Sequence, residues 1–62
     1  MKVFRATAYG FNPTNFVIAA KSVENATEIA RNQDMGSVDA EDVWEIDHLQ
    51  TNVEYECVLE QF

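Results

Sequence analysis

Four segments of this chain carry apolar side chains in repeating patterns that limit the fold more than any other feature. Residues 2–9, 43–49 and 53–60 alternate between two kinds of side chain, and residues 16–21 are apolar almost throughout. Alternation with period two is typical of a β-strand with two different faces, and a short apolar run bounded by turn residues indicates a strand covered on both faces. The patterns therefore predict four strands. The alternative for the third is a helix over residues 39–49, but Asp47 and His48 would interrupt its apolar stripe.

One helix is predicted between the second and the third strand. Ser22 is a suitable N-cap for this helix, and Gly36 is a suitable stop. The apolar side chains between them recur at helical spacing: Val23, Ala26, Ile29 and Ala30. We expect the helix over about residues 23–34. The order β-β-α-β-β predicts an α+β fold for a single domain of residues 1–62, with an antiparallel sheet and the helix packed on one face.

The size of the chain limits how it can be stabilised. A domain of 62 residues is close to the lower limit for folding alone. The single cysteine, Cys57, excludes an internal disulfide, and one cysteine with one histidine cannot supply a four-ligand zinc site. We therefore expect no metal or other cofactor, and stabilisation by packing or self-association. No apolar run approaches ~20 residues and no signal peptide is visible, so we expect a cytoplasmic location and no membrane contact.

Acidic and basic residues are separated along the chain. All eleven acids lie between residues 23 and 62 with a single base, Arg31, whereas residues 1–22 contain three bases and no acid. The net charge of −7 therefore arises in the second part of the chain. Such a charge favours a basic protein surface as partner and disfavours direct binding to nucleic acid.

The last two strands are expected to form a hairpin through a short loop at residues 49–52. In that register Asp47 lies opposite Glu54, and on the same face Glu45 lies opposite Glu56. Opposed like charges cost up to about 1 kcal/mol per pair, so a chain selected for stability alone would avoid them. The acids of this face are the predicted partner-binding residues: Glu45, Asp47, Glu54, Glu56 and Glu60. Their crowding should raise their pKa values.

The same register predicts the place of several other side chains. Trp44 and Tyr55 are expected on the helix-facing side, in the core. The loop acids do not predict a calcium site, because they lack the ligand spacing and the glycine of a calcium-binding loop. They are candidates for additional contacts to a partner: Asp39, Glu41 and Asp42. The residues that a homodimer would bury on the outer face are apolar: Val43, Val58 and Phe62.

No catalytic residue is predicted. The only candidates for a nucleophile and a base are Cys57 and His48, and in the predicted hairpin they lie about 13 Å apart along the strand direction. Proton transfer needs a separation of about 3 Å, so the two side chains cannot act together. The two glycines, Gly10 and Gly36, do not form a glycine-rich phosphate loop. We therefore expect a protein that is not an enzyme.

The junction between the second strand and the helix resembles part of a known family. Residues 16–30, with the sequence Phe-Val-Ile-Ala-Ala-Lys-Ser-Val-Glu-Asn-Ala-Thr-Glu-Ile-Ala, are similar to the DpnD/PcfM-like small proteins, and so is the later Val-Trp-Glu-Ile-Asp segment. Asn25 departs from that family, which often has an acid before the alanine. The resemblance implies a β-β-α-β-β fold and a bacterial, plasmid or phage setting, and it assigns no catalytic residue.

Two functions are compatible with these features. Very small acidic proteins are similar in type to phage-encoded inhibitors of host defence, including anti-CRISPR proteins and DNA mimics. The first hypothesis is therefore a phage or mobile-element inhibitor, which would dock its acidic sheet face onto a basic, nucleic-acid-binding protein in the host cytoplasm. The alternative is a small structural or assembly protein that acts as a homodimer, in which the acids serve solubility only.

Overall fold

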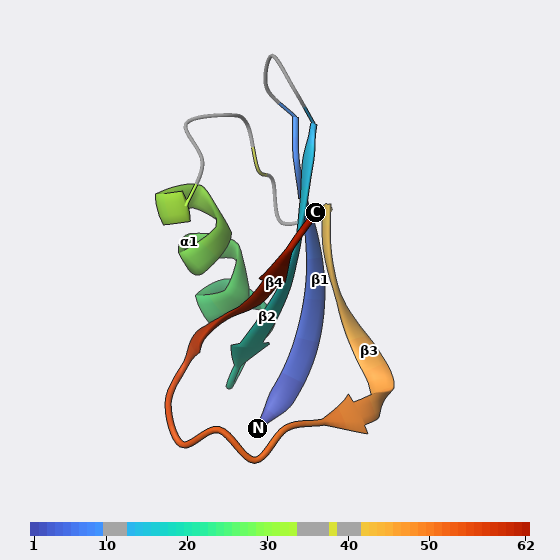
Figure 1. The fold of residues 1–62 in the computed structure, drawn as a ribbon, viewed down its shortest axis with the longest axis vertical. Helices are drawn as coiled ribbons and strands as arrows, with labels where there is room; N and C mark the ends of the chain where they lie inside the picture. Colours follow the sequence, from blue (N-terminus) through green and yellow to red (C-terminus); the bar gives the residue numbers. More distant parts are fainter. Residues whose placement is uncertain (10–12, 34–37, 39–41) are drawn as a thin grey trace.

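The computed structural model describes residues 1–9, 13–33, 38 and 42–62. Within these residues one antiparallel sheet of four strands carries one helix on one face, which confirms the predicted α+β fold (Figure 1). The elements follow in the predicted order: β1 (Lys2–Ala8), β2 (Thr14–Ala20), α1 (Val23–Gln33), β3 (Val43–Gln50) and β4 (Cys57–Gln61). The predicted helix stop at Gly36 and the loop acids Asp39 and Glu41 lie outside the described residues.

The first two strands form the central hairpin of the sheet. All seven residues of β1 pair with β2 in an antiparallel register. Phe4, Ala6 and Ala8 are buried on the side of the helix, whereas Arg5 and Thr7 are half-buried on the opposite, outer face. The alternation predicted for β1 is therefore observed.

The sheet order is β3-β1-β2-β4, so the predicted hairpin between the last two strands is wrong. β3 pairs with β1 and β4 pairs with β2, which places β3 and β4 at opposite edges of the sheet. The connection between them crosses the width of the sheet past the N-terminus, where Met1 and Thr51 exchange two backbone hydrogen bonds (Figure 1). Residues 53–56 belong to this connection and not to a strand.

Electrostatic repulsion gives a physical reason for this order. The predicted hairpin of residues 43–49 and 53–60 would set Asp47 opposite Glu54, at a cost of up to about 1 kcal/mol for each such pair. In the observed sheet β3 lies beside β1, which carries two of the three bases of the first segment. The Lys2 Nζ lies 3.9 Å from a Glu45 carboxylate oxygen. The central hairpin therefore separates the acids and brings Lys2 to one of them.

The two faces of β3 are the reverse of the prediction. Val43 pairs with Ala6 and is buried in the core, whereas Trp44 pairs with Arg5 on the outer face and is 48% exposed. Tyr55 lies in the connection and is 74% exposed. The prediction that Trp44 and Tyr55 are core residues is therefore wrong. Its physical reason is that β3 aligns against β1, where Val43 meets the buried row, and not against β4.

Small side chains bring the helix close to the sheet. Ala26 and Ala30 are fully buried and belong to the same cluster as Phe16 and Ile18 of β2. The predicted N-cap is confirmed, because the Asn25 backbone N–H donates to the Ser22 Oγ at 3.2 Å. No helix among the described residues is long and apolar enough to cross a membrane.

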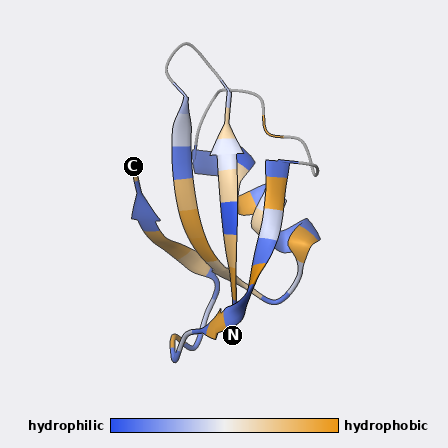
Figure 2. Cartoon of the chain, turned by 90° about the vertical axis from the view of Figure 1, so that its right-hand side faces the viewer, coloured by the Kyte–Doolittle hydropathy of each residue, from blue (hydrophilic) through white to orange (hydrophobic). Residues whose placement is uncertain are grey.

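The outer face of the sheet is not uniformly open. Figure 2 looks onto this face, with the helix behind it, and shows hydrophilic and hydrophobic residues on the central strands. Val3 and its partner Ala19 lie on this face and are nevertheless buried, at the end of the sheet where the connection crosses. The accessible part of the outer face therefore lies around Arg5 and beyond it, toward the β1–β2 turn.

The close approach of helix and sheet makes a prediction about stability. Replacing Ala26 with leucine should lower the free energy of unfolding by about 1–3 kcal/mol, because no space is left for the added atoms. A domain of this size has a total stability of about 3–9 kcal/mol, so the loss is easily measured by urea denaturation. Gln33→Leu, at an exposed position of the same helix, should change the stability by less than about 0.5 kcal/mol. Equal effects of both variants would contradict the packing described here.

Candidate functional site

The five predicted partner-binding acids do not share one face of the sheet. Glu45 of β3 pairs with Phe4, whereas Glu60 of β4 pairs with Val17 at the opposite edge. Asp47 lies further along β3, and Glu54 lies in the connection. The acidic sheet face of the sequence-based hypothesis is therefore not formed, because it depended on a hairpin that the chain does not make.

Glu56, one of the five acids, has a role within the fold. One of its carboxylate oxygens accepts a hydrogen bond from the Lys21 backbone N–H at 2.8 Å and another from the Asn25 side-chain amide at 2.9 Å. These bonds hold the connection before β4 against the junction between β2 and α1. The backbone hydrogen bond from Lys21, followed by the bond from Asn25, lowers the pKa of Glu56 below its ordinary value of 4.5. The predicted rise in pKa is therefore wrong for Glu56.

The lowered pKa of Glu56 predicts how stability depends on pH. A carboxyl whose pKa is lower in the folded than in the unfolded state stabilises the fold above its unfolded pKa, and this contribution is lost as the pH falls through the folded pKa. We expect Glu56→Gln to lower the melting temperature at pH 7, and we expect the difference from the wild type to shrink below pH 4.5.

The matched control for this measurement is Glu54→Gln, which changes an exposed acid of the same connection. Glu54 has no hydrogen bond or ion pair among the described residues, so its variant should leave the melting temperature almost unchanged at both pH values. A Glu56→Gln difference that grows as the pH falls would contradict the assigned role of Glu56.

Three of the five predicted acids remain available to a partner. Asp47, Glu54 and Glu60 are exposed, and within the described ranges none of their side-chain carboxylates has a hydrogen bond or an ion pair. Glu45, in contrast, lies beside Lys2. The loop acid Asp42 is half-buried directly before β3 and has an interaction of its own.

All four bases of the chain lie in the described part, and three of them make side-chain contacts within the fold. Lys2 is beside Glu45, whereas Lys21 contacts Glu56 through its backbone N–H. The Arg31 Nε donates to the Val38 carbonyl at 2.8 Å. The remaining base is in the central strand β1, where it contacts aromatic rings instead of acids.

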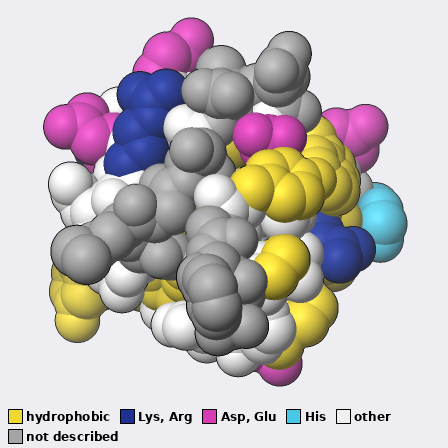
Figure 3. Space-filling view, turned by 90° about the horizontal axis from the view of Figure 1, so that it is seen from above, with side chains coloured by type: hydrophobic (Ala, Val, Ile, Leu, Met, Phe, Trp, Pro, Cys, Tyr) yellow, Lys and Arg dark blue, Asp and Glu magenta, His cyan; other side chains and the backbone are white. Residues whose placement is uncertain are grey.

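An arginine between two aromatic rings is the main feature of the accessible outer face. The Arg5 Cζ lies 5.8 Å from the centre of the Trp44 ring and 5.7 Å from that of Phe62. Both distances fall within the range of a cation–π contact. Figure 3 shows hydrophobic side chains gathered on one side of the molecule beside basic atoms. We call Arg5, Trp44 and Phe62 the aromatic–arginine cluster.

The sequence-based search missed this cluster, and it placed two of the three predicted dimer contacts incorrectly. Val43 is buried in the core and Val58 packs against the core, so neither lies on the outer face. Phe62 is 57% exposed and lies on that face, opposite Asn15. An arginine in an alternating strand does not by itself indicate such a cluster, because only the strand order shows that Trp44 and Phe62 lie beside Arg5.

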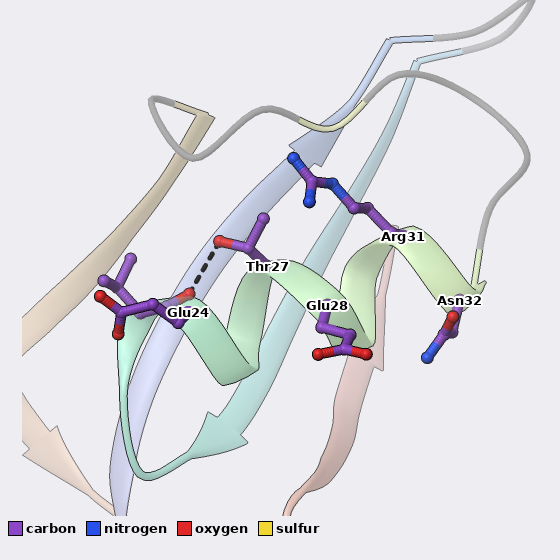
Figure 4. A pocket seen from close by; sticks show the side chains of 6 residues that line it. Glu24, Thr27, Glu28, Arg31 and Asn32 are labelled. Atoms are coloured by element: carbon purple, nitrogen blue, oxygen red, sulfur yellow. Dashed lines mark hydrogen bonds between the residues drawn. The ribbon is translucent and has the colours of Figure 1, made fainter.

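A groove beside α1 is lined mainly by residues with polar or charged side chains (Figure 4). The Thr27 hydroxyl donates to the Val23 carbonyl at 2.7 Å, so it is held by the helix backbone. Among the described residues, no three histidine, cysteine or acidic side chains are placed to hold a metal ion. The described residues that line the groove are Val23, Glu24, Thr27, Glu28, Arg31 and Asn32.

The two candidates for acid–base and nucleophilic chemistry are far apart. His48 lies on β3 and Cys57 on β4, at opposite edges of the sheet. Three strand spacings separate them, or about 14 Å. The structure therefore does not bring this pair within the reach that nucleophilic catalysis requires.

Comparisons with protein-family models, with curated proteins and with solved structures found no match for this chain. The resemblance to the DpnD/PcfM-like proteins therefore stays a prediction. The proposals below rest on the fold, on the distribution of charge and on the contacts of individual side chains.

Proposed function

We propose that this chain is a non-enzymatic binding protein that docks onto a basic protein surface. The observation that supports the proposal is uncompensated charge. Asp47 and Glu54 are exposed and have no ion pair within the described part of the chain, while Lys2 and Arg31 make contacts elsewhere. Exposed carboxylates without nearby bases are complementary to a basic surface and speed the encounter with it.

The fold narrows the set of acids that would contact such a partner. Glu45 lies beside Lys2, and Glu56 accepts a hydrogen bond from the Lys21 backbone N–H, so these two acids are less suited to a partner. Glu60 is exposed, but it lies on the outer face of the sheet at the β4 edge. The acids that best fit the proposal are therefore Asp47 of β3 and Glu54 of the connection.

The most specific form of the proposal is an inhibitor that occupies the nucleic-acid-binding surface of its target. The small size and the net charge of −7 support this form, since a basic surface that binds phosphates also attracts carboxylates. Phage-encoded anti-defence proteins, such as anti-CRISPR proteins and DNA mimics, are the type of inhibitor meant. The same net charge disfavours direct binding of this chain to nucleic acid.

The test compares two variants with the same change in net charge. Asp47→Asn/Glu54→Gln neutralises the proposed contacts, and Glu24→Gln/Glu28→Gln neutralises two exposed acids of α1. In a pull-down from a bacterial lysate, we expect wild type and the helix variant to retain a basic, nucleic-acid-binding protein and the first variant to lose it. Retention should also fall steeply above about 0.15 M salt, where exposed charges are screened within about 8 Å.

Both variants must first be shown to fold by circular dichroism. Equal retention of the basic protein by both variants would contradict a role for Asp47 and Glu54. Retention that does not depend on salt would contradict the electrostatic proposal as a whole.

A further inference from the structure

The outer face of the sheet carries a row of side chains with opposite charges at two of its positions. The strand registers place Trp44 opposite Arg5, Arg5 opposite Val17, and Val17 opposite Glu60. Directly opposed residues in antiparallel strands project from the same face. Arg5 and Glu60 are therefore on one face, two strand spacings or about 10 Å apart, and the described residues contain no ion pair between them.

Arg5 is short of hydrogen-bond acceptors in this position. Its Nε is buried, and no acceptor for it is found among the described residues. The Trp44 and Phe62 rings hold the guanidinium from two sides but accept no conventional hydrogen bond. A buried, unpaired donor on a charged group is unfavourable. Nε itself is closed to a second molecule, but Arg5 is half-buried and its other guanidinium nitrogens are not among the buried atoms, so a carboxylate from outside the chain would stabilise the charge there.

We propose that two copies of this chain pair through their outer faces, so that Arg5 of each copy binds Glu60 of the other. A two-fold axis parallel to the strands and passing over Val17 exchanges the strands on either side of β2. It therefore sets β1 of one copy over β4 of the second copy. Sheets stacked face to face lie about 10 Å apart, a distance that an arginine and a glutamate can span together.

The apolar residues of the face fit the same arrangement. Val17 is half-buried and would meet Val17 of the second copy at the axis. Phe62, on the row next to Arg5, is 57% exposed in the single chain and would be covered. A 62-residue chain gains from such burial, because it hides only about 60% of its unfolded surface when it folds alone.

The distribution of charge favours a second copy over an unrelated partner at this face. The row contains one base and one acid, so it is neutral and complementary to itself under a two-fold rotation. Asp47 and Glu54 are not in the row, and Glu24 and Glu28 lie on the helix. The dimer would therefore leave the acids of the proposed function free, and the two proposals can fail separately.

The test is a charge exchange measured by sedimentation equilibrium over micromolar to millimolar concentrations. Glu60→Arg should weaken the wild-type dimer at least about tenfold, since it sets like charges against each other twice. Arg5→Glu should do the same, and the double variant Arg5→Glu/Glu60→Arg should return to within about threefold of the wild type. Glu54→Arg is the matched control, because it changes the net charge by the same amount at an exposed position outside the row.

The control separates the specific contact from general repulsion. Both Glu60→Arg and Glu54→Arg change the net charge from −7 to −5, so repulsion between copies alone would make both variants associate more strongly than the wild type. Only the proposed contact predicts that Glu60→Arg associates more weakly than Glu54→Arg. A wild type that stays monomeric up to millimolar concentration would overturn the proposal. So would folded single variants that dimerise like the wild type, or a folded double variant that does not regain the dimer.

Discussion

The arrangement of the sheet depends on the pairing of β3 and β4 with the two sides of the central β1–β2 hairpin. The hairpin contributes most of the buried row beneath the helix, and its edges accept β3 and β4 on either side. The Lys2 side chain then meets Glu45, and the Lys21 backbone N–H meets Glu56, at the end of the sheet where the connection crosses. The individual contacts are weak, because exposed ion pairs contribute only about 0–1 kcal/mol, and burial of the apolar layer stabilises the fold.

This arrangement assigns different roles to acids that look alike in the sequence. Glu56 holds the connection to the helix junction, and Glu45 lies beside a lysine. Asp47 and Glu54 remain exposed and are the residues that we propose for a basic partner, while Glu60 lies on the outer face with the aromatic–arginine cluster. The proposed docking onto a basic partner and the proposed pairing of two copies would therefore involve different residues of the same small domain.

The elements were predictable from local patterns, whereas the neighbours of each strand were not. The N-cap at Ser22 and the alternation of Phe4 with Arg5 are properties of adjacent residues, and the structure shows both as expected. The hairpin from β3 to β4 was wrong, because a short polar segment after Gln50 is equally suited to a turn and to a connection across the sheet. With that error Trp44 was placed in the core and the acids on one face. The Arg5 contacts join residues 5, 44 and 62, which only the strand order brings together.

The most direct test of this account is the strand order, measured by nuclear Overhauser effects between backbone protons of neighbouring strands in solution. The account predicts contacts between Ala6 and Val43 across β1 and β3, and between Ile18 and Val58 across β2 and β4. It predicts none between β3 and β4, which are separated by β1 and β2. Cross-strand contacts that set Asp47 beside Glu54 would contradict it, because the acids would then share one face and the central hairpin would not separate them.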